Sequence, residues 1–276
     1  MELDFSDLDS YLIAQKGMII HQVWFGTIPT KGKSKIQYRE WKKYRDSWKI
    51  KNPDWYHIEW DRKMCATLVH TFYPEHEEMF TKYSYEIQRC DAIRYFILHR
   101  YGGLYADMDC YCNKSWTEVL KEYPQDIYFV QTSVPNGLEA EYISNCLMYS
   151  KPNHPFWKYF FLELTKNQSY PYYPRHLQIS LTTGLRILDR AYKRTKFKYR
   201  LFSYPYRVFN PYGIADEELL FTGNKEIYSV HFSKGSWHDK DTKFIDFFFR
   251  DWKFILFTFL VLFVPVIYSI TERLKQ

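Results

Sequence analysis

Residues 89–109 read RCDAIRYFILHRYGGLYADMD, and this stretch decides the fold. It contains most of a helix predicted over residues 86–101, because apolar side chains recur there on one helical face. These side chains are Ile87, Cys90, Ile93, Phe96 and Ile97. Gly102 and Gly103 are expected to end the helix. A short strand is predicted at residues 104–106, and Asp107 and Asp109 follow at its carboxyl end.

Apolar and amphipathic segments alternate on both sides of this stretch. The pattern predicts strands at residues 18–25, 55–60, 127–132 and 227–232, and helices at residues 38–50, 64–69, 75–83, 155–165 and 177–192. Such alternation is typical of an α/β sheet covered by helices, so the predicted fold class is α/β. Open sheets of this class bind ligands at the carboxyl ends of their strands, which is where Asp107 and Asp109 lie.

The composition narrows the range of functions. The chain has 276 residues, 46% of them hydrophobic and 25% charged, and its net charge is 38 − 32 = +6. These values exclude a disordered chain and a polytopic membrane protein, and they fit one globular domain with an appendage. The positive charge forms no stripe and no nucleic-acid-binding motif is present, so no nucleic-acid partner is expected. Five cysteines without a CxxC pair indicate reduced thiols and a domain that faces the cytosol.

Residues 254–270 read FILFTFLVLFVPVIYSI and carry no charge. As a helix this segment would be about 25 Å long, which predicts a single transmembrane helix; a buried terminal helix is the alternative. Residues 241–253 are predicted as an amphipathic juxtamembrane segment and residues 271–276 as a tail. More basic residues precede the span than follow it, so the main domain is expected on the cytoplasmic side, as with a tail anchor. Glycans on the sequons at Asn113 or Asn167 would instead indicate a lumenal domain.

Three groups of polar residues are candidates for a site. Asp107 and Asp109 can reach one divalent ion, and hard oxygen ligands favour Mn²⁺ or Mg²⁺; a solvated pair of aspartates is the alternative. Asp91 and Arg94 share a helical face and could hold a polyol, or they could form an ion pair on a solvated helix surface. His231 ends a predicted strand and is a candidate metal ligand, although a lone histidine is more often a satisfied polar residue.

The stretches 89–95 and 101–109 resemble the DXD region of a glycosyltransferase family. This family includes the yeast initiating α-1,6-mannosyltransferase and the inositolphosphoceramide mannosyltransferases. Residues 19–26, IIHQVWFG, are similar to the first strand of that family. The resemblance covers residues 18–237. It implies a GT-A-type nucleotide-diphospho-sugar transferase fold, with a mixed central sheet flanked by helices, as a catalytic domain over residues 18–240 behind an N-terminal segment of residues 1–17. It also implies retention of the anomeric configuration.

The resemblance assigns roles to particular residues. It implies metal ligands, catalytic residues and donor-binding residues, with Asp107 also a possible contact of the donor ribose and Trp24 stacked near the nucleotide base. The metal ligands are Asp107, Asp109 and His231; the catalytic residues are Asp107, Asp109 and Trp237; the donor-binding residues are Trp24, Asp91, Arg94, Asn145, Lys234 and Ser236. The chain departs from the family pattern at Cys90, where Ser is usual, and at Leu185, where Pro is usual, and both departures concern the acceptor side.

These features predict a metal-dependent retaining glycosyltransferase with Mn²⁺ or Mg²⁺ as cofactor. It would move a hexose, with mannose favoured, from GDP-mannose or a UDP-sugar to a membrane-associated acceptor such as a sphingolipid or another glycolipid. One alternative is a membrane-anchored carbohydrate-binding protein without activity. Another is an Asp-x-Asp phosphohydrolase, which expects Thr or Val where this chain has Tyr111.

Overall fold

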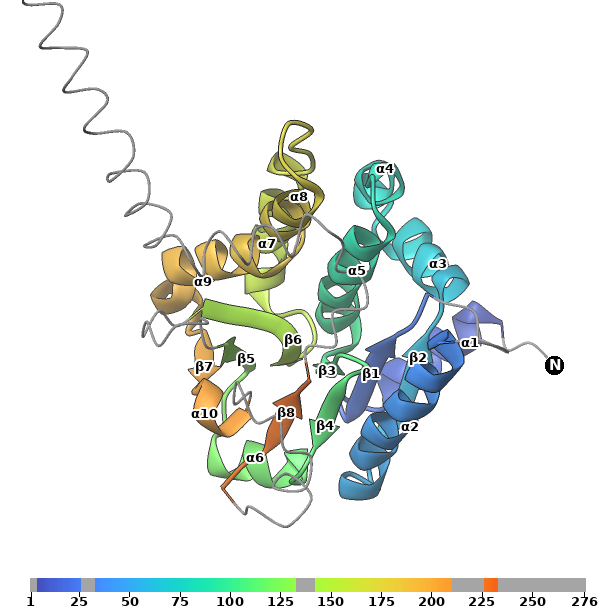
Figure 1. Cartoon of the computed structure of the whole chain (residues 1–276), viewed down its shortest axis with the longest axis vertical. Helices are drawn as coiled ribbons and strands as arrows, with labels where there is room; N and C mark the ends of the chain where they lie inside the picture. The colour runs from blue at the N-terminus through green and yellow to red at the C-terminus, as the bar shows by residue number, and fades with distance from the viewer. Residues whose placement is uncertain (1–3, 26–32, 133–141, 210–225, 233–276) are drawn as a thin grey trace, which may run out of the picture.

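The computed structural model describes residues 4–25, 33–132, 142–209 and 226–232 (Figure 1). Its strands are β1 (Ile19–Val23), β2 (Tyr56–Trp60), β3 (Gly103–Ala106), β4 (Cys110–Cys112), β5 (Ile127–Thr132), β6 (Tyr142–Ser150), β7 (Phe202–Tyr204) and β8 (Ser229–His231). Six of them form one sheet in the order β2-β1-β3-β6-β5-β7, in which β6 runs antiparallel to both of its neighbours and the other pairs are parallel. β4 and β8 form a separate antiparallel pair. The described chain is thus a mixed α/β sheet, as the sequence predicts.

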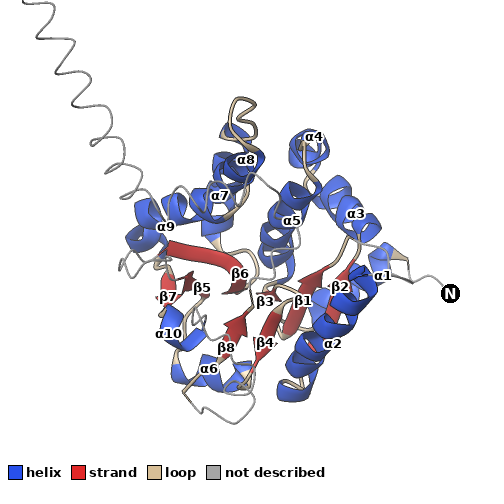
Figure 2. Ribbon diagram, in the orientation of Figure 1, coloured by secondary structure: helices blue, strands red, loops and turns tan. Residues whose placement is uncertain are grey.

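Helices lie on both sides of the central sheet (Figure 2). They are α1 (Phe5–Ala14), α2 (Lys33–Lys51), α3 (Arg62–Phe72), α4 (Pro74–Lys82), α5 (Glu86–Tyr101), α6 (Trp116–Glu122), α7 (Pro155–Lys166), α8 (Arg175–Thr182), α9 (Leu185–Tyr199) and α10 (Tyr206–Phe209). Local signals explain several of the boundaries. Asp61 caps α3 by accepting from the backbone N–H of Met64 at 2.8 Å, and Pro155 begins α7.

The sheet separates two hydrophobic cores, because neighbouring side chains along a strand point to opposite faces. Ile19 and Tyr105 belong to the larger core, which packs the sheet against α3, α4, α5, α7 and α9. Ile20 and Leu104 belong to the second core, which also contains Trp48 of α2 and side chains of α6 and α10. The central strands are therefore covered on both faces, as is typical of an α/β sheet.

The structure confirms most of the predicted elements and adds others. Strands β1, β2, β3 and β5 and helices α2, α3, α4, α5 and α7 coincide with predicted segments, although α2 begins earlier, at Lys33. The predicted strand at residues 227–232 is present as β8, but it pairs with β4 outside the main sheet. The sequence pattern did not predict β6, because Ser144 and Asn145 interrupt its apolar run. In the structure Asn145 lies at the candidate site described below, and the hydroxyl of Ser144 accepts from the backbone N–H of Cys146 at 3.3 Å.

The single helix predicted at residues 177–192 is wrong, because two helices, α8 and α9, meet there at Thr183 and Gly184. Gly184 has extended backbone dihedrals, φ −87° and ψ −157°, which a continuous helix does not allow. A Cβ atom at Gly184 would lie 3.1 Å from the Cα of Ser180 and 3.5 Å from Oδ2 of Asp91. This close approach brings the break between the two helices against α5.

No helix within the described residues has the length and hydropathy needed to cross a membrane. The predicted transmembrane helix at residues 254–270, the juxtamembrane segment and the tail lie outside the described residues. The boundaries predicted for these segments therefore stay predictions.

Candidate metal centre

Asp107 and Asp109 lie in the short link between the two sheets, directly after β3. The backbone N–H of Asp107 donates to the carbonyl of Cys146 at 2.8 Å, which extends the pairing of β3 with β6 by one residue. The N–H of Cys110 then donates to the carbonyl of Asp107 at 3.0 Å, so the chain turns tightly before β4 begins. This turn places both carboxylates at the carboxyl edge of the parallel strands β1 and β3.

Gly102 and Gly103 determine where β3 begins, and therefore where Asp107 lies. Gly102 and Gly103 have φ of +64° and +89°, values that residues with a Cβ rarely adopt. At Gly103 an added Cβ would lie 2.4 Å from the carbonyl oxygen of Ile19 in β1. Glycine at this position thus lets β3 leave α5 and enter the sheet directly beside β1.

The structure brings His231 to this acidic pair from more than a hundred residues further along the chain. β8 pairs with β4 so that His231 lies opposite Cys110. Nε2 of His231 is 3.1 Å from Oδ1 of Asp109 and 3.9 Å from Oδ2 of Asp107. The backbone N–H of Phe232 also donates to the carbonyl of Asp109 at 3.1 Å, which holds the end of β8 against the turn.

Burial and charge shift the protonation of this group. Burial raises the pKa of Asp107 to about 6, with Asp109 acting in the same direction and Arg94 and His231 acting against it. For His231, burial acts to lower the pKa, but the nearby charges of Asp109 and Cys146 outweigh it and hold the pKa well above its usual value. The raised pKa of His231 thus favours a positively charged imidazole beside Asp109, and the raised pKa of Asp107 favours its neutral form.

The donor set fits a divalent cation. One ligand atom from each of Asp107, Asp109 and His231 lies within 4.8 Å of the others. Two ligands at right angles around an ion at about 2.1 Å would be ~3 Å apart, close to the separation of His231 and Asp109. Two carboxylate oxygens and an imidazole nitrogen suit Mn²⁺ and tolerate Mg²⁺. The structure thereby groups the three residues that the sequence predicted as ligands; their role as ligands stays a prediction.

Arg94 connects the acidic pair to α5. Its side chain is 4% exposed, and its guanidinium lies 2.9 Å from Oδ1 of Asp91 and 3.1 Å from Oδ1 of Asp107. It also donates to the carbonyl of Asn145 at 2.7 Å. The pair of Asp91 and Arg94 is therefore buried rather than a solvated helix pair. Tyr105 adds a second anchor, because its hydroxyl donates to Oδ1 of Asp107 at 2.7 Å.

Asn145, predicted as a donor-binding residue, lies in the same buried network. Its Nδ2 donates to Oδ1 of Asp91 at 3.0 Å and to the hydroxyl of Tyr95 at 3.2 Å. The hydroxyl of Thr183 donates to the other oxygen of Asp91 at 3.4 Å. Burial raises the pKa of Asp91, while Arg94, Asn145 and Thr183 act to lower it. The polar residues of β6 and of the α8–α9 junction are thus assembled around one carboxylate beside Asp107.

Trp24 packs in a small cluster of mainly aromatic side chains that includes Met108, the residue between the two aspartates. Its ring contacts that of Trp41 edge to face, with centroids 5.1 Å apart, and both pack with Met108, which separates the two aspartates in sequence. Tyr44 stacks on Phe232, the residue after His231, at 4.5 Å. The sequence did not single out Trp41, Tyr44 or Phe232; aromatic content alone gave no position for them.

Three predicted site residues, Lys234, Ser236 and Trp237, lie outside the described residues. The other predicted site residues are described, and they all lie in α5, β6, β8 or the residues that directly follow β1 and β3. Their roles toward a donor stay predictions. A further group that the sequence did not predict contains Cys110 and Cys146, whose thiols also approach His231.

Comparisons with known proteins show which family this chain resembles. Residues 38–126, which include the acidic pair, match the family described as glycosyltransferase sugar-binding region containing DXD motif. The chain is 30% identical over 227 residues to inositol phosphoceramide mannosyltransferase 2 of Schizosaccharomyces pombe, covering 82% of this chain and 59% of that protein. It is 32% identical over 211 residues to mannosyl phosphorylinositol ceramide synthase CSH1 of Saccharomyces cerevisiae, covering 75% of this chain and 50% of that protein. The resemblance found in the sequence is thus confirmed.

The chain spans between half and two thirds of the length of these two curated relatives. Among solved structures, it is similar to the ligand-free glycosyltransferase domain from the YGT toxin, with a TM-score of 0.49 and 9% identity, over 68% of this chain and 80% of that chain.

Proposed function

From a chain that carries the sugar-binding region of a DXD-containing glycosyltransferase family, we propose a metal-dependent retaining hexosyltransferase of the GT-A type. The donor we propose is a nucleotide-diphospho-sugar, with GDP-mannose ahead of a UDP-sugar. The two curated relatives are named for inositol phosphoceramide and mannosyl phosphorylinositol ceramide, so the acceptor we propose is a membrane sphingolipid of that class.

One observation carries this proposal: Asp107, Asp109 and His231 converge within 4.8 Å at the carboxyl edge of the sheet, although β3 and β8 are far apart in sequence. These three side chains would hold Mn²⁺, or Mg²⁺ in its place. When bound, the cation supplies positive charge that neutralises the diphosphate of the donor. Stabilising charge on a leaving group is commonly the largest contribution to catalysis in such a site.

The neighbouring residues hold this centre in shape. Arg94 and Tyr105 both contact Asp107, so its carboxylate keeps one orientation as a donor approaches. Asp91 and Asn145 both contact Arg94, and we propose that they face the donor sugar. Trp24, beside Trp41 and Met108, is proposed to stack near the base of the nucleotide.

The segment after β8 completes the proposal. Lys234, Ser236 and Trp237 carry N–H and O–H groups suited to phosphate oxygens, and they follow His231 closely in sequence. We propose that they bind the departing diphosphate. Since no carboxylate is nominated as a covalent nucleophile, we propose a front-face transfer in which the leaving phosphate accepts the acceptor's proton.

We also propose that residues 254–270 anchor the protein in a membrane and that the catalytic domain lies on the cytoplasmic face. An anchor raises the local concentration of an acceptor confined to the same bilayer. Protease added to sealed microsomes that contain the full chain should digest the catalytic domain without detergent. Protection of the domain until detergent is added would place it in the lumen instead.

The function is tested with the full chain in detergent, supplied with GDP-mannose, Mn²⁺ and inositol phosphoceramide. We expect a mannosylated lipid, and we expect Asp109→Asn to lower turnover by about 10³-fold. Asp126→Asn is the matched control, because it makes the same chemical change on a side chain that is 62% exposed and paired with Lys151. Its turnover should equal that of the wild type.

Three outcomes would contradict the proposal. Equal turnover for Asp109→Asn and the wild type would contradict a catalytic role for a metal bound by Asp109. Release of phosphate from a generic phosphatase substrate, without sugar transfer, would favour a phosphohydrolase. Binding of the sugar nucleotide with neither transfer nor hydrolysis would favour a carbohydrate-binding protein without activity.

A further inference from the structure

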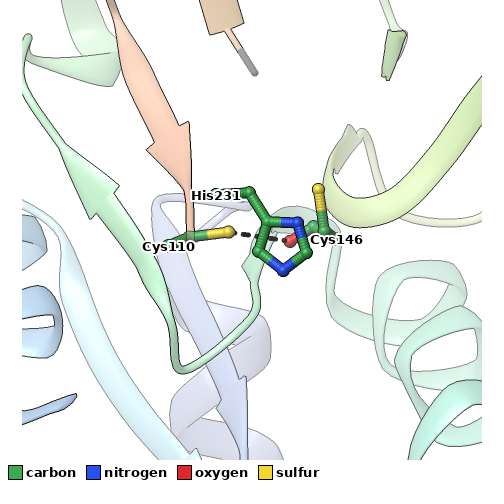
Figure 3. A group of neighbouring side chains, drawn as sticks. All are labelled: Cys110, Cys146 and His231. Carbon is green, nitrogen blue, oxygen red and sulfur yellow. Dashed lines mark hydrogen bonds between the residues drawn. The ribbon is translucent and has the colours of Figure 1, made fainter. Parts of the chain in front are cut away.

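His231 belongs to a second group of potential ligands besides the acidic pair. One atom each of Cys110, Cys146 and His231 lies within 4.8 Å of the others. Figure 3 shows the imidazole ring between the two sulfur atoms, with Cys110 at the start of β4, His231 at the end of β8 and Cys146 on β6. The thiol of Cys110 donates to the carbonyl of Cys146 at 3.6 Å, which joins the small sheet to the central one.

The chemistry of this second group differs from that of the acidic pair. Two thiols and an imidazole form a soft donor set, which selects Zn²⁺ or Cd²⁺ over Mn²⁺ and Mg²⁺. Cys110 and Cys146 are 1% and 2% exposed, so bulky thiol reagents in the solvent do not reach their sulfur atoms. The side chains of His231 and Asp109 are 19% and 14% exposed to solvent, so a cation can reach the group past these two residues.

We infer that Cys110, Cys146 and His231 form a binding site for a soft divalent cation, Zn²⁺ or Cd²⁺, which competes with the acidic site for His231. When the cation binds, each thiol releases one proton to the solvent, and the protonated imidazole of His231 releases one as well. Two thiolates, a neutral imidazole and a divalent cation then give the group a net charge of zero. Such neutrality is what a buried site requires.

The two sites exclude each other because they share one imidazole. A neutral imidazole offers one nitrogen lone pair, and its other nitrogen carries a proton. If the soft cation takes that lone pair, the acidic site keeps only Asp107 and Asp109. Two divalent cations within a few ångströms would also repel each other strongly in this partly buried place. The soft cation therefore acts as an inhibitor that removes one ligand from the proposed Mn²⁺ site.

The first experiment measures the soft site alone. The full chain, reduced and stripped of metal in detergent, is titrated with Cd²⁺ while the ultraviolet thiolate-to-cadmium absorption is followed. We expect saturation at one equivalent for the wild type and loss of the signal in Cys110→Ser and Cys146→Ser. Cys112→Ser is the matched control. This buried thiol also lies in β4, but it donates a hydrogen bond to the carbonyl of Lys114 and accepts one from the side chain of Asn52, and it lies outside the group of Cys110, Cys146 and His231.

A second measurement keeps the test valid if the serine variants fail to fold. X-ray absorption of the Zn²⁺-loaded wild-type chain should show two sulfur ligands and one nitrogen ligand around zinc. A first shell of oxygen and nitrogen only, or a Cd²⁺ signal that Cys112→Ser removes as completely as Cys146→Ser does, would overturn the inference.

The competition for His231 rests on the proposed function, since it requires Mn²⁺ at the acidic site. Electron paramagnetic resonance of free Mn²⁺ is followed as Zn²⁺ is added to the Mn²⁺-loaded chain. We expect release of Mn²⁺ from the wild type at a Zn²⁺ concentration at least about tenfold lower than from the Cys110→Ser, Cys146→Ser double variant, which lacks the thiol ligands. Equal concentrations would refute the sharing of His231. A chain that binds no Mn²⁺ at the outset would refute the proposed metal centre, and the Cd²⁺ titration would still report on the thiols.

Discussion

Replacing Arg94 with Met removes a buried cation from between two carboxylates. The guanidinium lies 2.9 Å from Asp91 and 3.1 Å from Asp107, and the Arg94 side chain is only 4% exposed. Removal of one partner from a buried ion pair typically costs about 3–5 kcal/mol, because the remaining charge is left without compensation. We expect Arg94→Met to lower the free energy of unfolding by that amount at pH 8, measured by urea unfolding of the full chain in detergent.

The loss should depend on pH in a definite direction. Burial already raises the pKa of Asp107 to about 6 and that of Asp91 above its usual value, while Arg94 lowers both. Without Arg94 both pKa values should rise further, so the folded chain binds protons more tightly than the unfolded chain, whose aspartates titrate near 3.9. Stability of the variant therefore falls as the pH rises above about 4, and the loss relative to the wild type should be smaller at pH 5 than at pH 8.

Two controls separate this explanation from a general effect of losing an arginine. Arg62→Met breaks a surface pair in which Arg62 is 62% and Glu86 40% exposed, and it should cost less than about 1 kcal/mol. Asp91→Asn combined with Arg94→Met should recover part of the loss, because one uncompensated charge is gone. A loss below 1 kcal/mol for Arg94→Met, or the same loss at both pH values, would refute the reasoning.

Three further predictions concern the backbone, the buried histidine and the proposed donor site. Gly103→Ala should lower the free energy of unfolding by at least about 2 kcal/mol, because the new Cβ meets the carbonyl oxygen of Ile19 at 2.4 Å. The control Gly17→Ala, at φ +80° with no atom nearer than 3.6 Å, should cost only about 1 kcal/mol in the same unfolding assay. Equal losses for the two variants would contradict the clash at Gly103. Burial lowers the pKa of His21 to about 3, so the unfolded chain binds a proton at His21 before the folded chain does, and the free energy of unfolding should fall as the pH decreases from about 6.5. His21→Gln should reduce the slope of the free energy of unfolding against pH by ~1.4 kcal/mol per pH unit. An unchanged slope would argue against a buried, neutral His21. Trp24→Ala should raise the Kd for GDP in the presence of Mn²⁺ about tenfold, as measured by calorimetry, since base stacking contributes about 1–3 kcal/mol; an unaltered Kd would remove the stacking role.

Much of the site could be predicted because the residues of α5 and of the turn after β3 lie close together in the sequence. The helix before Gly102, the glycine turn and the strand that ends at Asp107 depend on periodicity and on glycine's access to positive φ, which are properties of neighbouring residues. His231 became a candidate through its position after an apolar run and through the family resemblance. Sequence spacing also placed Asp91 and Arg94 on one helical face, and their contact at 2.9 Å agrees with it.

The sequence could not predict which side chains those residues would meet. Arg94 was expected beside Asp91, but its contact with Asp107 depends on α5 packing behind β3. The strand β6 was missed because Ser144 and Asn145 interrupt its apolar pattern. Buried Asn145 is tolerated there because it donates hydrogen bonds to Asp91 and Tyr95 of α5. The helix predicted across Thr183 and Gly184 was wrong because Gly184 has extended backbone dihedrals there, and the chain at this break lies close to Asp91 of α5.

By itself, the sequence determined that a strand would present Asp107 and Asp109 at its carboxyl end, and it carries the resemblance to a DXD-containing glycosyltransferase family. Only the tertiary structure decided that β8 would pair with β4, so that one imidazole faces two carboxylates on one side and approaches two thiols of β4 and β6. The physical reason is that pairing between distant strands is selected by the burial of the whole sheet and of its two cores. No spacing within either segment records that choice.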